Sequence, residues 1–116
     1  MMRTNFRMED EYITMTRGDT LSFGVELADQ DGNPFDIDSA YFTCKKDLTD
    51  VAVVFQKSLN NGITRDDAGL YTVRVAPDDT KSIKAGKYFY DLQVGAGDDV
   101  FTIMRGVLEI EQDVTD

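Results

Sequence analysis

Alternation of apolar and polar residues with a period of two recurs along this chain, and no long segment shows the spacing of three and four that an amphipathic helix needs. The clearest case is residues 20–28, where Leu21, Phe23, Val25 and Leu27 fall on one side of an extended chain. Because successive side chains of a strand point to opposite faces, the pattern indicates a strand with one apolar face. Its recurrence predicts an all-β domain with very little helix.

Turn residues separate the alternating segments, and their positions show how many strands to expect. Asp-Gly, Asn-Gly and Gly-rich stretches interrupt the chain, and they suit turns because glycine accepts a positive φ and proline presets its own. We place about seven strands at residues 12–16, 20–28, 40–46, 51–58, 70–76, 87–94 and 100–111, with one short helical turn at 77–83. This number and spacing predict an immunoglobulin-like antiparallel β-sandwich.

The length of 116 residues and the hydrophobic fraction of 41% are sufficient for one hydrophobic core. No repeat or low-complexity linker divides the chain, so we expect a single domain over 1–116, with 1–10 as an N-terminal arm and 112–116 as a frayed tail. Cys44 is the sole cysteine, which excludes a disulfide within the chain. Its place in an alternating segment predicts a small buried side chain and not a reactive thiol.

The charge of the chain excludes several classes of partner. The net charge is −10, and the only adjacent basic pair is Lys45-Lys46, so no basic stripe can neutralise phosphates. We therefore expect no binding to nucleic acid or to a membrane. The N-terminal residues lack an apolar core, and no run approaches the roughly 18 apolar residues of a membrane span, so we expect the chain to be made in a cytoplasm.

Catalytic residues are scarce. The chain has no histidine, which removes the commonest general base, the Ser-His-Asp triad and every histidine metal site. Paired carboxylates remain as candidates, but the doublets lie in predicted turns, where aspartate bonds its own backbone; they are Asp66-Asp67, Asp78-Asp79 and Asp98-Asp99. We expect no enzyme activity, no cofactor and no metal.

Two short motifs match known binding sequences, one in part and one in full. Residues 29–33 carry an Asp-Gly fragment of a calcium loop, but the later ligands and the flanking helices of such a loop are missing. Arg17-Gly18-Asp19 spells the integrin-recognition tripeptide, although Gly-Asp between two strands is ordinary turn chemistry. We interpret both as turns.

A tyrosine follows a glycine by two residues at the start of two predicted strands, at Gly69 and Tyr71 and at Gly86 and Tyr88. This is the local pattern of a tyrosine corner in immunoglobulin-like sandwiches. Tyr88 fits better, because a corner tyrosine belongs on the penultimate strand. The tryptophan and the cysteine pair of antibody domains are missing, so an immunoglobulin-like architecture here implies no kinship to antibodies.

The turn and strand motifs together resemble the N-terminal domain of phage baseplate upper proteins. The motifs are Gly18-Asp19-Thr20, Asp31-Gly32-Asn33-Pro34-Phe35-Asp36-Ile37, Asp79-Thr80, Ala85-Gly86-Lys87-Tyr88-Phe89-Tyr90-Asp91-Leu92, and Gly106 before Leu108 and Ile110. The resemblance implies a structural protein of a phage or prophage tail or baseplate, which binds other virion proteins and remains in the virion after assembly in the bacterial host. The turn 36–39 departs from the family's pattern.

A free-standing adhesion or carbohydrate-binding sandwich is the alternative to a tail component. Sugar sites use exposed aromatic rings with polar groups between them, and without tryptophan the candidates are Tyr12, Tyr41 and Phe101.

The final predicted strand, 100–111, is apolar on both faces. Phe101, Ile103 and Val107 share one face, and Val100, Met104, Leu108 and Ile110 share the other. We predict that a second chain, either a further copy or a tail protein, or else the N-terminal segment around Phe6 and Met8, covers the first of these faces. The alternative is that Phe101 and Ile103 close the chain's own core.

Overall fold

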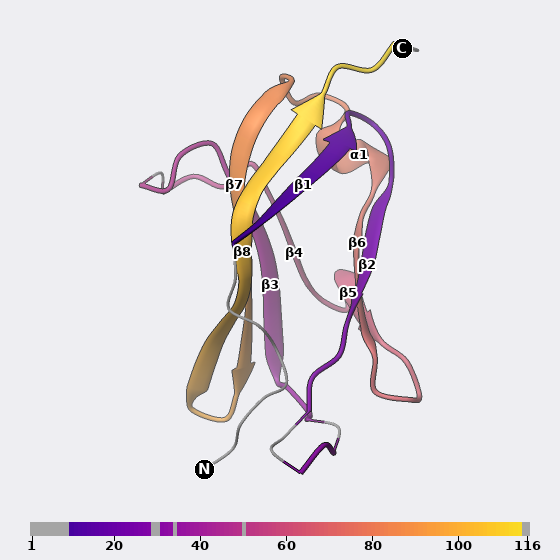
Figure 1. Ribbon diagram of the computed structural model, residues 1–116, viewed down its shortest axis with the longest axis vertical. Coiled ribbons are helices and arrows are strands. Elements are labelled where there is room, and N and C mark those ends of the chain that lie inside the picture. Colours follow the sequence, from indigo (N-terminus) through magenta and orange to yellow (C-terminus); the bar gives the residue numbers. More distant parts are fainter. Residues whose placement is uncertain (1–9, 29–30, 34, 50, 115–116) are drawn as a thin grey trace.

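A computed structural model describes residues 10–28, 31–33, 35–49 and 51–114, which form eight strands and one short helix (Figure 1). The elements are β1 (Asp10–Thr16), β2 (Leu21–Val25), β3 (Ser39–Lys45), β4 (Phe55–Leu59), β5 (Gly62–Arg65), β6 (Tyr71–Val75), α1 (Pro77–Thr80), β7 (Gly86–Ala96) and β8 (Asp99–Glu111). The prediction of an all-β domain is confirmed.

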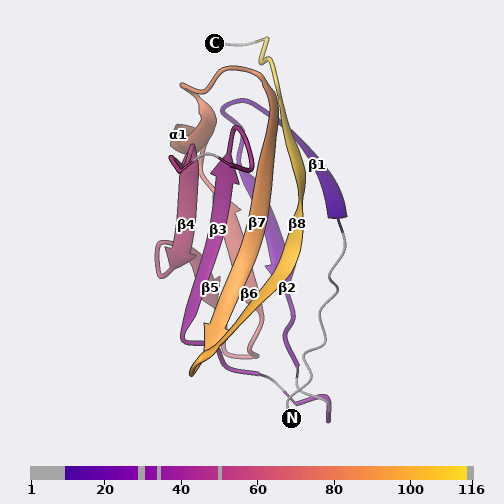
Figure 2. The ribbon, with the colours of Figure 1, turned by 90° about the vertical axis from the view of Figure 1, so that its left-hand side faces the viewer.

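The strands form a two-layered β-sandwich. Hydrogen bonds join all eight strands into one folded sheet in the order β1-β8-β7-β3-β4-β5-β6-β2. We call β1, β8, β7, β3 and β4 the larger sheet and β5, β6 and β2 the smaller sheet, and Figure 2 shows β8, β7, β3 and β4 in front of β5, β6 and β2. Most neighbours pair antiparallel, but β1 runs parallel to β8, and two residue pairs join β4 and β5 in parallel. This arrangement is an immunoglobulin-like sandwich, as predicted, with eight strands instead of about seven.

The additional strand is β5, which begins directly after a tight turn. Asn60 has φ 66° and Gly62 has φ 101°, and such left-handed values let the chain bend sharply within a few residues. The turn carries the chain from the larger sheet to the smaller one. The predicted strand at 51–58 begins later than expected, at Phe55, because β3 ends at Lys45 and residues 51–53 lie beyond that end. The Val54 N–H still donates to the Cys44 backbone oxygen at 2.7 Å.

The core lies between the two layers and is rich in aromatic rings. Phe42 is fully buried, and its ring lies 5.4 Å from that of Tyr90 and 5.6 Å from that of Phe23, which comes from the opposite sheet. Cys44 is also fully buried, and burial raises the pKa of its thiol to about 12. The interpretation of Cys44 as a buried hydrophobic side chain is confirmed.

A tyrosine corner fixes the start of β7. The Tyr88 hydroxyl donates a hydrogen bond of 2.5 Å to the backbone oxygen of Lys84, four residues upstream. Tyr71, the other candidate, instead accepts a long hydrogen bond of 3.4 Å from the backbone N–H of Ile37. The sequence therefore identified the correct corner tyrosine.

A β-bulge in β8 changes which of its residues face the core. Leu92 pairs with Met104 and Gln93 pairs with Thr102, so Ile103 is the extra residue between them. The bulge shifts the alternation of inward and outward side chains by one position. Ile103 at the bulge and Leu108 beyond it are therefore both buried in the core, although they belong to different faces in the sequence pattern. Apolar residues from both alternating faces of the strand thus lie in one core.

The bulge corrects the prediction that another chain covers the face with Phe101 and Ile103. Ile103 is only 1% exposed, and Phe101 packs edge-to-face on Phe35 with ring centroids 6.2 Å apart. Both close the chain's own core, which was the alternative. Val107 pairs with Phe89 and faces outward instead. Phe6 and Met8 lie outside the described residues.

Candidate functional site

The outer face of the larger sheet is the surface on which functional side chains gather. Residues paired across neighbouring strands share a face, so the register defines rows across β3, β7 and β8. The three central rows are Lys45, Phe89 and Val107; Thr43, Asp91 and Arg105; and Tyr41, Gln93 and Thr102. Tyr12 of β1 extends the first row beside Val107.

Exposed apolar side chains cluster on this face. Among the described residues, the exposed large hydrophobic side chains are Tyr12, Tyr41, Leu48, Val51, Val53, Val100 and Val114. The first five of these line hollows on the outer face of the larger sheet. Single exposed apolar residues are normal, but a contiguous group indicates an interaction surface.

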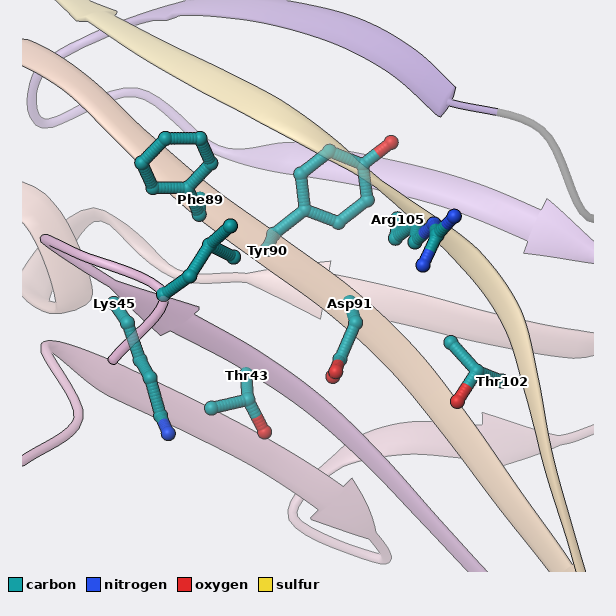
Figure 3. A pocket seen from close by; sticks show the side chains of 8 residues that line it. Thr43, Lys45, Phe89, Tyr90, Asp91, Thr102 and Arg105 are labelled. Carbon is teal, nitrogen blue, oxygen red and sulfur yellow. The ribbon is translucent and has the colours of Figure 1, made fainter. Parts of the chain in front are cut away.

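Two hollows adjoin on this face and share four of their lining residues, Leu48, Phe89, Tyr90 and Arg105. A hollow of about 490 Å³ lies over Tyr12, Phe89 and Val107, and one of about 270 Å³ lies over Thr43, Asp91 and neighbouring residues. Leu48 of the β3–β4 loop borders both and is 73% exposed. Figure 3 shows Asp91 on β7 between Thr43 of β3 and Thr102 of β8. The face therefore offers an apolar half and a polar half.

The polar half carries charges of both signs. Asp91 is half-buried, and burial raises the pKa of its carboxyl group while Lys45 lowers it. Arg105 lies beside Asp91 in the register and lines the same hollow. Two cations and one carboxylate thus stand at the centre of one face, in a chain whose net charge is −10.

Tyr12 is held in place at the edge of the face. Its hydroxyl donates a hydrogen bond of 2.5 Å to Glu109, and this bond raises the pKa of Tyr12. The Nζ atom of Lys87 lies 5.9 Å from the centre of its ring. The contacts fix the ring beside Val107 but place a cation near it, which leaves less of the ring open to a ligand.

The Arg17-Gly18-Asp19 motif has a structural role here. The Arg17 guanidinium contacts Asp113 Oδ1 at 2.8 and 2.9 Å and donates to the backbone oxygen of Ile83 at 3.3 Å. The Gly18 N–H donates to Thr80 Oγ1 at 2.8 Å. The arginine is therefore engaged within its own chain, as expected for a turn and not for a receptor ligand.

Two of the aspartate doublets also have structural partners. Asp66 Oδ1 accepts hydrogen bonds from the backbone N–H groups of Ala68 and Leu70, and Asp79 pairs with Lys57 and accepts from the N–H of Ala76. These are the backbone contacts that turn aspartates make. Among the described residues, no group of three or more acidic, cysteine or histidine side chains is placed to hold a metal ion.

Of the three predicted interaction residues that the structure describes, Phe101, Ile103 and Val107, only Val107 lies on the outer face. The sequence alone did not identify Phe89, Leu48 or Arg105 as residues of this surface. Phe89 carried a usable signal, since it is a large apolar residue at an outward position between Tyr88 and Tyr90, which face the core. Leu48 lies between the predicted strands 40–46 and 51–58, beside the charged Asp47, and nothing in its local sequence indicates an interaction surface.

No family model matches the chain, and no curated protein matches it. Among solved structures, it is similar to the crystal structure of domains 4 and 5 of the S-layer protein SbsC, with 17% sequence identity and a TM-score of 0.40. The likeness covers 95% of this chain and 50% of the S-layer chain. A likeness at this level supports no inference about function, and the fold rests on the strand order and register. No helix in the described part of the chain is long and apolar enough to cross a membrane.

Proposed function

We propose that this protein is a non-enzymatic interaction module that binds other proteins through the outer face of its larger sheet. The observation that carries the proposal is the gathering of Tyr12, Tyr41, Leu48, Val51 and Val53 on that one face. Monomeric proteins rarely leave such groups uncovered, because covering them removes apolar surface from water.

The proposed setting is the tail or baseplate of a phage or prophage. The motifs that resemble the N-terminal domain of baseplate upper proteins support it, and the partners are then other tail proteins. In this proposal the protein assembles in the cytoplasm of the bacterial host and remains in the virion as a structural component.

Co-expression with the proteins encoded by the neighbouring genes, which we expect to be tail proteins, tests the proposal. Val107→Asp places a carboxylate in the apolar half of the face, and we expect the tail partner to be lost from the purified complex. Thr72→Asp is the matched control, because Thr72 is also β-branched and half-buried but lies in β6 of the smaller sheet. If no tail protein co-purifies with the wild type, or if both variants behave alike, the proposal fails.

A carbohydrate-binding surface is the second candidate. Tyr41 supports it, because its ring is exposed on the same face as Thr43, Asp91 and Gln93, which can bond sugar hydroxyl groups. Phe101 does not support a carbohydrate site, because its ring packs on Phe35. Titration with a panel of bacterial surface glycans tests this candidate, and Tyr41→Ala is expected to abolish any binding that the panel reveals.

A further inference from the structure

We propose that a second copy of this chain covers the outer face of the larger sheet in a face-to-face dimer. The two-fold axis runs parallel to the strands and passes between β7 and β8. The inference rests on the proposed function, since it uses the same face and names a second copy of this chain, itself a tail protein in the proposed setting, as the protein that the face binds. It follows from the self-complementarity of the side chains on β7 and β8.

The register of β7 and β8 gives the expected contacts. A two-fold axis between two neighbouring strands places each residue over the copy of its own cross-strand partner. Phe89 then lies over Val107 of the second copy, and Gln93 lies over Thr102 of the second copy, because these residues are paired within one chain. An apolar side chain thus meets an apolar one, and an amide meets a hydroxyl group.

The same axis matches the charges. Asp91 pairs with Arg105 within the chain, so each carboxylate lies over the guanidinium of the other copy, and the contact occurs twice. Arg105 has contacts in its own chain, but a guanidinium carries five N–H donors and can bind a further carboxylate. Two copies of this acidic chain repel each other overall, since its net charge is −10, so opposite charges that meet across the contact offset part of that repulsion.

The size of the face suits a dimer. Four strands, β1, β8, β7 and β3, face the second copy across this axis. Spaced about 4.8 Å apart and contributing about seven residues each, they cover roughly 450 Å² in projection, and the accessible surface of side chains exceeds its projection. A standard interface buries about 800 Å² on each partner. The sheet together with Leu48, Val51 and Val53 of the β3–β4 loop therefore supplies the area that a specific dimer needs.

Exchange of the two central charges tests the dimer. The wild type is expected to sediment at close to twice its chain mass of 13.0 kDa. Asp91→Arg places like charges opposite Arg105 of the second copy, and Arg105→Asp places like charges opposite Asp91, so each variant alone is expected to sediment as a single chain. A one-to-one mixture restores both attractive contacts and is expected to return to the double mass.

Further variants control for folding. Arg74→Asp makes the same charge change as Arg105→Asp on the exposed face of β6, and we expect it to leave the double mass unchanged. If Asp91→Arg alone fails to fold, the variant carrying both exchanges in one chain replaces it, and it is expected to dimerise with itself. A wild type that sediments as one chain, single variants that remain dimeric, or a failure of both the mixture and the doubly exchanged chain to dimerise overturns the proposal.

The two proposals fail separately. If the wild type is a single chain but a tail protein co-purifies with it and is lost in Val107→Asp, the face binds a tail protein and not a second copy. If the wild type is a dimer that Val107→Asp dissociates, and no tail protein co-purifies, the dimer stands and the tail assignment fails.

Discussion

Arg17 in the β1–β2 turn and Asp113 after β8 form an ion pair of 2.8 Å, which fastens the turn to the end of the last strand. The side chains are about four-fifths buried, at 23% and 19% exposed. Such a pair contributes more than an exposed one, because little water screens it.

Arg17→Ala is expected to lower the free energy of unfolding by about 1–2 kcal/mol, because it also removes the hydrogen bond to Ile83. Arg65→Ala is the control, since Arg65 pairs with the 79% exposed Asp36, and its expected cost is below about 1 kcal/mol. Urea denaturation of both variants measures the difference. Equal losses would show that the Arg17 pair has no special role.

Tyr88→Phe is expected to cost about 1 kcal/mol of stability, because it removes the hydrogen bond to Lys84 and leaves the ring in place. Tyr12→Phe removes a hydrogen bond at an exposed site and is expected to cost less than about half of that. Chemical denaturation compares the two. A neutral Tyr88→Phe would mean that packing alone fixes the corner.

Ile103→Ala is expected to cost about 2–4 kcal/mol, because it leaves a cavity beside fully buried neighbours. Val100→Ala, three residues earlier on the same strand, is expected to change stability by less than about 0.5 kcal/mol because Val100 is 63% exposed. Thermal and urea unfolding measure both variants. Similar small effects would place Ile103 outside the core.

Cys44 is expected to resist alkylation at mildly alkaline pH in the folded protein and to react quickly in urea. Burial raises the pKa of its thiol from 9.0 to about 12, so the native state holds its proton where the unfolded state loses it. The unfolded chain then binds fewer protons, and stability falls as the pH rises from 9 to 12. Mass spectrometry after timed alkylation measures the first effect.

Cys44→Ala isolates the second effect from the tyrosines and lysines that titrate in the same range. The stability of the variant is expected to fall less steeply with pH than that of the wild type above pH 9. Parallel slopes would contradict a thiol with a raised pKa.

The sequence by itself determined the class of fold and several of its local features. The alternation in 20–28 and 40–46 identified strands, and the spacing of Gly86 and Tyr88 identified the tyrosine corner. The position of Cys44 in its strand also indicated its burial. These features depend on residues close together in the chain, where the pleat of a strand or the geometry of a turn fixes the relation between sequence and structure.

Only the tertiary structure decided which face of β8 is buried and where the interaction surface lies. The sequence of a strand with two apolar faces does not show which face is buried. The bulge at Ile103 decides this, and it exists only in the pairing of β8 with β7. The outer face likewise combines Phe89, Val107 and Leu48 from two strands and a loop, and their proximity depends on strand order. Local periodicity records the faces of one strand, whereas burial depends on the strands and loops that pack against it.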